Sequence, residues 1–191
     1  MAGLRGVPHY PRCHGTGARA GRQPEDHGHR VHVRPIRVKV ATCSYPSQEN
    51  TVANRFQNPD AEGIRRLLQE ARSIAVVGLS PKVNRPSYQV AKAMQGFGYR
   101  IIPVRPAIDE VLGEPAYADL YALPSRPDIV DVFRAPEHVA EIVDACIALK
   151  VPVLWLQDGV INEPEALRAQ QAGITVVMNR CIFRDYRQYL S

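Results

Sequence analysis

The feature that most constrains the fold is a short apolar run over residues 74–77, which stops at Gly78 and leads into a loop with two cations, Lys82 and Arg85. An amphipathic segment follows the loop. A buried strand, a glycine-containing loop and a helix start form the anion-binding corner of doubly wound α/β domains. Glycine permits a close approach of the backbone to a ligand, and the first helical turn has N–H groups without intrahelical acceptors. The loop lacks the second and third glycines of G-x-G-x-x-G, so the usual dinucleotide fingerprint is not met.

Strand and helix patterns alternate along the chain from residue 58 onward. Asp60 stands where it can cap the first helix, and Pro136 begins a later one. The predicted strands are 74–77, 99–104, 129–133, 153–156 and 175–178, and the predicted helices are 61–71, 86–95, one from residue 136 and 163–172. Residues 117–123 are expected to form one helical turn. The alternation predicts an α/β class: a Rossmann-like, doubly wound domain with a five-stranded parallel sheet.

The N-terminal part has a different composition. Residues 1–50 hold eight Lys and Arg against three acidic residues, whereas residues 51–191 hold sixteen of each, so the net charge of +5 belongs to the N-terminal part. It also carries five of the six histidines, but their spacing with Cys13 fits no zinc template. This composition predicts a basic, disordered tail over residues 1–54, followed by the α/β domain at 55–191. A start assigned too far upstream is an alternative origin of the tail.

Charge and hydropathy exclude several classes of function. The neutral domain has no electrostatic footprint for nucleic acid. No segment approaches the ~18 apolar residues of a membrane span, and no apolar core of a secretory signal is present. The four cysteines follow no disulfide or metal-binding pattern, which favours reduced thiols, a cytoplasmic location and no metal site.

The residues that follow the predicted strands are rich in glycines, cations and amides. In an open parallel sheet the ligand lies beyond these carboxyl ends. They are Gly78, Leu79, Ser80, Lys82 and Arg85 after the first strand, Arg105 after the second, Arg134 after the third, Gln157 and Gly159 after the fourth, and Asn179, Arg180 and Cys181 after the fifth. Asp158, between Gln157 and Gly159, is the one acid in these segments, and they contain no histidine. The set suits phosphate, and no catalytic residue is predicted.

Arg105 narrows the choice of ligand. NAD-binding domains have an acidic residue at the end of the second strand, whereas an arginine there suits a ribose phosphate. The candidate ligands are therefore NADP, with its 2′-phosphate, and coenzyme A, with its 3′-phosphate. The alternative is that Arg105 is a solvated loop residue that contacts no ligand. The strand ends offer no Tyr-x-x-x-Lys or other proton donor, which counts against an oxidoreductase.

The sequence also predicts the surroundings of two further residues, Asp131 and Cys181. Asp131 interrupts a buried strand, which predicts either a cation from a neighbouring loop as its partner or a position at the sheet edge. Cys181 is expected to be a buried structural cysteine, with a position near a ligand thiol as the alternative.

Several motifs resemble a known family in their order and spacing. They are Ile74–Ser80, Arg85–Tyr88, Tyr99–Val104, Asp128–Arg134, Val153–Gln157 and Val176–Cys181. They resemble the small bacterial CoA-binding proteins related to the N-terminal domain of the succinyl-CoA synthetase alpha subunit, over about residues 60–185. The resemblance implies a CoA-binding Rossmann-like domain whose nucleotide is surrounded by the Gly78–Ser80 loop, the end of the second strand and the Gln157–Gly159 turn, with Phe133 also at the site.

The chain departs from the family pattern at two positions: Arg105 stands where asparagine is usual, and Asn179 where an acid is common. The phosphohistidine and the grasp-type domain of the synthetase have no counterpart, so ligase activity is not implied. The expected function is non-catalytic binding or sensing of CoA or an acyl-CoA, with a CoA-dependent enzyme as a candidate partner. The alternatives are an NADP-dependent oxidoreductase-like domain and an accessory subunit of an acyl-CoA ligase.

Overall fold

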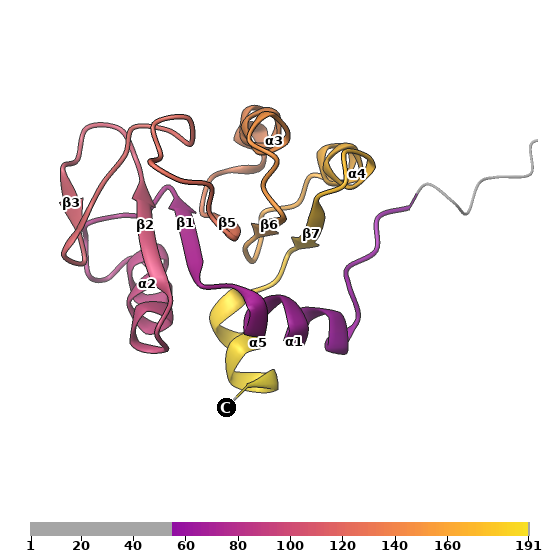
Figure 1. Cartoon of the computed structure of the whole chain (residues 1–191), viewed down its shortest axis with the longest axis horizontal. Coiled ribbons are helices and arrows are strands. Elements are labelled where there is room, and N and C mark those ends of the chain that lie inside the picture. The colour runs from indigo at the N-terminus through magenta and orange to yellow at the C-terminus, as the bar shows by residue number, and fades with distance from the viewer. Residues whose placement is uncertain (1–54, 191) are drawn as a thin grey trace, which may run out of the picture. The chain divides into compact units, whose positions relative to one another are not determined.

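The central feature of the fold is a parallel β-sheet. The computed structural model describes residues 55–190, so the predictions for the tail, residues 1–54, lie outside the described residues. Within 55–190, five strands form one parallel sheet in the order β2-β1-β5-β6-β7 (Figure 1). They are β1 (Ser73–Val77), β2 (Arg100–Val104), β5 (Ile129–Val132), β6 (Val153–Leu156) and β7 (Thr175–Met178). The predicted α/β class and five-stranded parallel sheet are confirmed.

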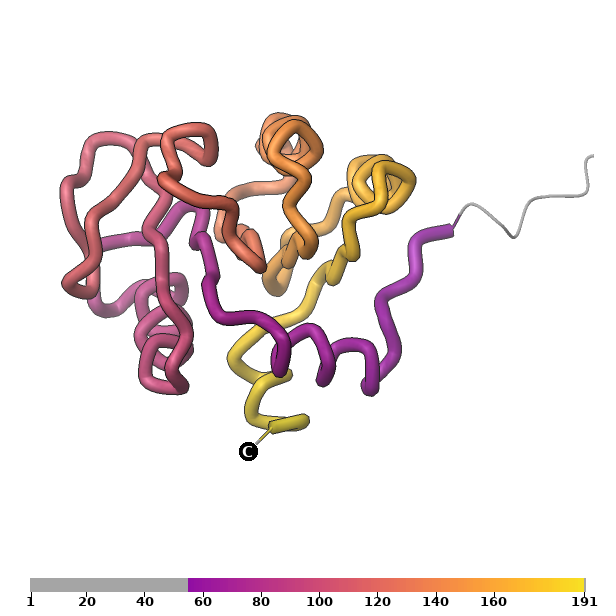
Figure 2. Tube along the Cα trace, in the orientation of Figure 1, coloured from indigo at the N-terminus to yellow at the C-terminus, as the bar shows by residue number. Residues whose placement is uncertain are grey.

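Helices cover both faces of this sheet, and the tube in Figure 2 follows the chain between the layers. Helices α3 (Val139–Ala148) and α4 (Glu163–Gln171) lie on one face; α1 (Ala61–Glu70), α2 (Pro86–Gly96) and α5 (Ile182–Tyr189) lie on the other. Alternate strand residues point to opposite faces, so Ala75 packs with α3 and α4, and Val76 with the other helices. This double burial explains why the strands are nearly continuous apolar runs. No helix within 55–190 is long and apolar enough to cross a membrane.

The strand order places a topological switch point at β1. Strand β1 pairs with β2 on one side and with β5 on the other, and the sheet then continues through β6 and β7. The chain leaves β1 toward α2 on one face of the sheet and leaves β5 toward α3 on the other face, so the two crossovers diverge at the carboxyl ends of β1 and β5. Ligands of doubly wound sheets bind in this crevice.

Side chains satisfy backbone groups at the helix ends. The Asp60 carboxylate accepts a hydrogen bond from the backbone N–H of Gly63 at 2.7 Å, so α1 begins where the sequence predicts. At the other end of α1, the buried Tyr99 hydroxyl donates to the carbonyl of Leu68 at 2.6 Å. Asn162 caps α4 by accepting from the N–H of Glu165 at 3.3 Å.

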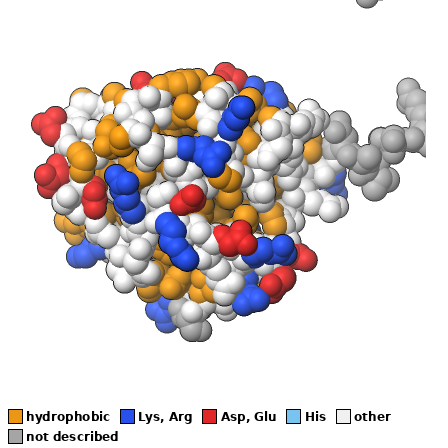
Figure 3. All heavy atoms as spheres, in the orientation of Figure 1, with side chains coloured by type: hydrophobic (Ala, Val, Ile, Leu, Met, Phe, Trp, Pro, Cys, Tyr) orange, Lys and Arg blue, Asp and Glu red, His pale blue; other side chains and the backbone are white. Residues whose placement is uncertain are grey.

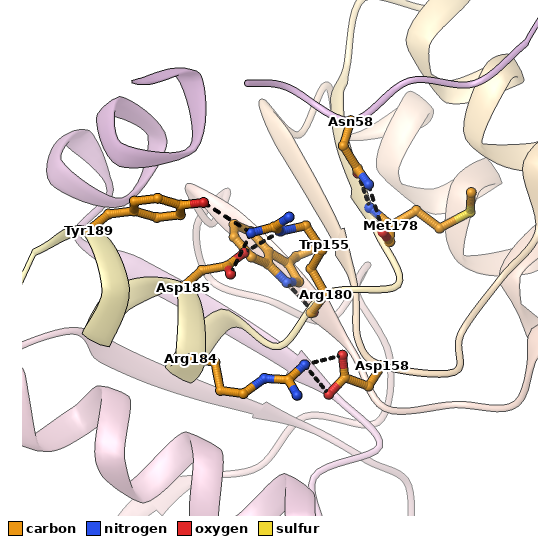
Figure 4. A network of polar contacts seen from close by, with 8 residues as sticks. All are labelled: Asn58, Trp155, Asp158, Met178, Arg180, Arg184, Asp185 and Tyr189. Atoms are coloured by element: carbon orange, nitrogen blue, oxygen red, sulfur yellow. Dashed lines mark hydrogen bonds and ion pairs between the residues drawn. The ribbon is translucent and has the colours of Figure 1, made fainter. Parts of the chain in front are cut away.

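Both edges of the sheet are covered. On β7, the Asn58 amide donates to the Met178 carbonyl at 3.0 Å and accepts from the Met178 N–H at 2.7 Å (Figure 4). On β2, Tyr117 donates its N–H to the Pro103 carbonyl at 2.9 Å and accepts from the N–H of Arg105 at 2.8 Å. Such cover removes the open row of backbone groups through which edge strands associate.

The segment between β2 and β5 differs from its prediction. Strands β3 (Glu110–Val111) and β4 (Glu114–Pro115) form a short antiparallel hairpin, and both turn residues, Leu112 and Gly113, have positive φ. The helical turn predicted at residues 117–123 is wrong. Tyr117 pairs with β2 instead, and the Asp119 carboxylate accepts from two following N–H groups, which forms a turn.

Helix α5 is not among the predicted elements, and Pro136–His138 forms a 3₁₀ turn before α3 begins. The apolar residues Ile182, Phe183, Tyr186 and Tyr189 recur at helical spacing, a signal that the prediction missed in a helix of eight residues without a side-chain cap. Tertiary contacts hold it: the Tyr186 ring stacks on Phe97 of the α2 end, with centroids 4.0 Å apart.

Candidate functional site

A cavity of about 640 Å³ lies where the carboxyl ends of the central strands meet the start of α2. The structure brings eight of the ten predicted site residues to its wall: Gly78, Ser80, Lys82, Arg85, Arg105, Phe133, Arg134 and Gln157. The other two are not in its lining. Leu79 is fully buried in the core between the sheet and α2, and Gly159 donates its N–H to Asn179 Oδ1 at 2.9 Å in the adjacent turn.

Gly78 sets the distance between two loops of the site. Its φ is +87°, and a Cβ placed there would lie 2.7 Å from the carbonyl oxygen of Phe133. Glycine is therefore required by the packing of the β1 loop against the loop after β5. From the sequence alone, this glycine is expected to let a ligand approach the backbone closely. Within the described residues, the group that approaches it is instead the backbone of Phe133.

The loop after Gly78 is held by two buried serines. The N–H of Ser80 donates to Ser87 Oγ at 3.1 Å, and the N–H of Lys82 donates to Ser80 Oγ at 3.2 Å. Pro86 is the first residue of α2, and it lines the cavity together with Ser87. The N–H of Ser87 belongs to the first turn, where the helix supplies no acceptor, so the positive end of the α2 dipole faces the cavity. Ser87 was not among the predicted site residues, although its place at a helix start is a signal for it.

Four cations surround the cavity: Lys82, Arg85, Arg105 and Arg134. Among residues 55–190 none of their side chains forms an ion pair or a hydrogen bond, whereas Arg168 is paired with Asp144 and with Glu165. The cavity therefore has an excess of positive charge.

The acid in the cavity lining is already neutralised. Both carboxylate oxygens of Asp158 lie 2.6 Å from the Arg184 guanidinium (Figure 4). Elsewhere basic and acidic side chains are interspersed, as the face in Figure 3 shows. The four cations are thus available to a ligand with several negative charges.

Asp131 lies directly behind the cavity. Its side chain is 1% exposed in β5, and Gln157 Nε2 donates to its Oδ1 at 2.8 Å. Burial raises the pKa of Asp131 to about 7, against which the hydrogen bond from Gln157 acts. Both expectations for this residue are wrong: its partner is a neutral amide, and β5 lies inside the sheet. The amide is the partner because Gln157 follows the neighbouring strand β6, two residues after Trp155, which is opposite Asp131 in the sheet.

The residues after β7 are structural. The Arg180 guanidinium binds both oxygens of Asp185, at 2.7 and 2.8 Å, and its carbonyl accepts from the Trp155 indole N–H at 2.8 Å (Figure 4). Asn179 has φ +57° and holds the turn at Gly159. These contacts fix α5 to the sheet.

The two described cysteines differ in environment. Cys181 lines the cavity and is only partly buried, so the expectation of a buried structural cysteine is wrong. Cys146 is buried between α3 and the sheet, and this burial raises the pKa of its thiol to about 12.

A second, more apolar recess of about 350 Å³ adjoins the first. The two share Gly78, Arg105 and Arg134. Its other walls are largely apolar and include Val77, Val104, Pro106, Leu120, Tyr121, Ile142 and Ala145. In the described part of the chain no cluster of His, Cys, Asp and Glu has the makings of a metal site. The arrangement suits an elongated ligand with phosphate groups at the shared arginines and an apolar group beside them.

Known proteins resemble this chain in sequence and in fold. A family model described as CoA binding domain matches residues 72–187. YneT of Bacillus subtilis, an uncharacterized protein, is 43% identical over 127 residues, which are 66% of this chain and 94% of YneT. The solved structure of a hypothetical protein from Pyrococcus horikoshii is 32% identical, with a TM-score of 0.68 over 71% of this chain and 98% of that one.

A structure from Thermus thermophilus is also 32% identical, with a TM-score of 0.67 over 69% of this chain and all of that one. The region matched by the family model contains the five strands of the parallel sheet and every predicted site residue. The resemblance to small CoA-binding proteins that the motifs indicate is confirmed. The chain belongs to the CoA binding domain family.

Proposed function

We propose that the cavity binds coenzyme A or an acyl-CoA, and that the protein acts as a non-catalytic CoA-binding or sensing protein. The observation that carries the proposal is the set of four cations around one cavity, without partners in residues 55–190, at the switch point of the sheet. CoA has a diphosphate and a 3′-phosphate, and charge-assisted hydrogen bonds from Arg and Lys are the strong contacts for such groups. The donor set therefore fits this ligand.

The chemistry of the walls supports one orientation of CoA. Lys82, Arg85 and the N-terminus of α2 are assigned to the diphosphate, because the helix dipole adds to their charge. Arg105, at the end of β2, is assigned to the 3′-phosphate, and the apolar recess beside it suits the adenine ring. Leu79 and Gly159 would then contribute through their backbone.

The non-catalytic assignment rests on the lack of an acid–base pair at the described cavity. Asp158 is bound to Arg184, and Asp131 is bonded to Gln157 outside the cavity lining. Cys181 has no base as a hydrogen-bond partner among residues 55–190. A CoA-dependent enzyme remains the proposed partner. An NADP-dependent activity, or a role as an accessory subunit of an acyl-CoA ligase, is the competing function.

Calorimetric titration of the full chain with CoA, dephospho-CoA and NADP tests the proposal. CoA is expected to bind more tightly than NADP. Arg105→Ala is expected to weaken CoA by about tenfold or more, because a charged contact is worth roughly 1.5–3 kcal/mol, and to leave dephospho-CoA nearly unchanged.

Arg66→Ala is the matched control, since Arg66 is exposed on α1 and forms no ion pair within 55–190. This variant should bind both CoA forms as the wild type does. NADP binding without a CoA signal would overturn the assignment, and equal losses for CoA and dephospho-CoA in Arg105→Ala would remove Arg105 from the 3′-phosphate.

A further inference from the structure

The Gln157 side chain joins the cavity to a buried carboxyl group. It is 4% exposed, it lines the cavity, and its Nε2 lies 2.8 Å from Asp131 Oδ1. An ionised carboxylate only accepts hydrogen bonds, so the amide nitrogen must face Asp131 whenever that residue is charged. The charge of Asp131 therefore decides the orientation of this amide.

The amide oxygen of Gln157 is directed elsewhere. Within 55–190 no group donates to Oε1, yet no enclosed side-chain nitrogen or oxygen there lacks a partner. Oε1 must therefore reach open space, and the open space at Gln157 is the cavity. An acceptor on the cavity wall that has no donor from the protein favours a ligand that supplies one.

We propose that Asp131 is a positioning residue that fixes the Gln157 amide with its oxygen toward the cavity, so that the site accepts a hydrogen bond from an N–H group of its ligand. The proposal rests on the proposed function and adds a selectivity to it. CoA offers such N–H groups in the two amides of its pantetheine arm and in the amino group of adenine. A ligand with an acceptor at the same place would meet the Gln157 oxygen and bind less well.

The arrangement makes this selectivity depend on pH. A protonated Asp131 has an O–H that can donate to Oε1, so the amide is then free to adopt either orientation. Burial raises the pKa of Asp131 to about 7, which places the change near neutral pH. In wild-type protein the Gln157 oxygen is therefore fixed toward the cavity above this pH and not below it.

No other titrating group faces the Asp131 carboxyl in the described structure. Its neighbours along the sheet are Val76 of β1 and Trp155 of β6, and the buried Asp185 of α5 is held by Arg180. The ionisable residues that line the cavity beyond Gln157 are Lys82, Arg85, Arg105, Arg134, Asp158 and Cys181. None of them is bonded to Asp131, whose partners are Gln157 and the backbone of Val132.

The test compares CoA affinity at pH 6 and pH 8 in wild type, Asp131→Asn and Asp128→Asn. Asparagine cannot fix the amide, so Asp131→Asn should bind CoA about threefold to tenfold more weakly than wild type at pH 8, and equally at pH 6. Asp128 stands just before β5 at the opposite end of the strand, where it binds Arg72 and Ser73, so its variant should follow the wild type. Because the three proteins are compared at the same pH, titration of the CoA phosphates affects all three affinities alike.

A second readout does not depend on the folding of Asp131→Asn. In ¹⁵N-glutamine-labelled wild type, the Gln157 side-chain amide, assigned by its loss in Gln157→Leu, should shift between pH 6 and pH 8. Pantetheine and adenosine 3′,5′-bisphosphate then show which part of CoA supplies the N–H. An amide signal that does not change with pH, or the same pH dependence of CoA binding in all three proteins, overturns the positioning role and leaves the proposed function intact. A wild type that does not bind CoA overturns both.

Discussion

Replacing Gly78 with alanine should destabilise the domain more than any replacement of a glycine with open surroundings. The φ of +87° alone costs a non-glycine residue about 1–2 kcal/mol. The new Cβ would also lie 2.7 Å from the Phe133 carbonyl oxygen and 3.1 Å from Arg134 Cδ, and overpacking of this kind adds about 1–3 kcal/mol. The expected loss is thus about 2–5 kcal/mol in the free energy of unfolding.

Gly98 provides the matched control. Its φ is +97°, and a Cβ there would meet nothing within 4 Å, so Gly98→Ala should lose only about 1–2 kcal/mol. Urea unfolding of the two variants at equal m-value isolates the cost of the close approach. Gly78→Ala should also bind CoA more weakly, because the displaced loop carries Arg134. Equal stability losses in the two variants would refute the inference that loop packing requires this glycine.

Two further predictions concern buried titrating groups. Because folding raises the pKa of Asp131 from 3.8 to about 7, its contribution to the free energy of unfolding is complete below pH 4 and is lost as pH rises to 7. The stability of Asp131→Asn relative to wild type should therefore increase between pH 5 and pH 8, by up to about 4 kcal/mol. If urea unfolding shows the same difference at every pH, the assignment is contradicted. Iodoacetamide should label Cys181 and spare Cys146, whose pKa is about 12, until urea unfolds the domain; peptide mass spectrometry would show equal labelling if the burial were wrong.

Much of the fold could be predicted because its signals are local. The runs at residues 74–77 and 153–156 are apolar at every position, and such strands occur in parallel sheets covered on both faces. Asp60 signals the start of α1 by its capping chemistry. Helix α5 has apolar residues at helical spacing, but it is only eight residues long and has no side-chain cap, and Phe97 and Arg180 hold it from outside the helix.

The candidate site, too, could be predicted from the sequence only in part. The strand-end rule brings the cations Lys82, Arg85, Arg105 and Arg134 to one edge without any coordinates, because parallel strands end on the same side of a sheet. The rule cannot tell Arg134 from Arg180, which has the same position relative to its strand. Only the structure shows that Asp185 neutralises Arg180 and that Arg134 has no such partner within 55–190.

By itself the sequence determined the α/β class, the strand positions and the positive edge of the sheet, because these follow from hydropathy and residue type over a few neighbours. Only the tertiary structure decided what each polar side chain contacts. Asp131 and Gln157 are 26 positions apart, and their pairing depends on the register of β5 against β6. Gly78 meets Phe133 only because β1 and β5 are adjacent strands. Contacts between distant segments arise when the chain packs, and local pattern carries no record of them.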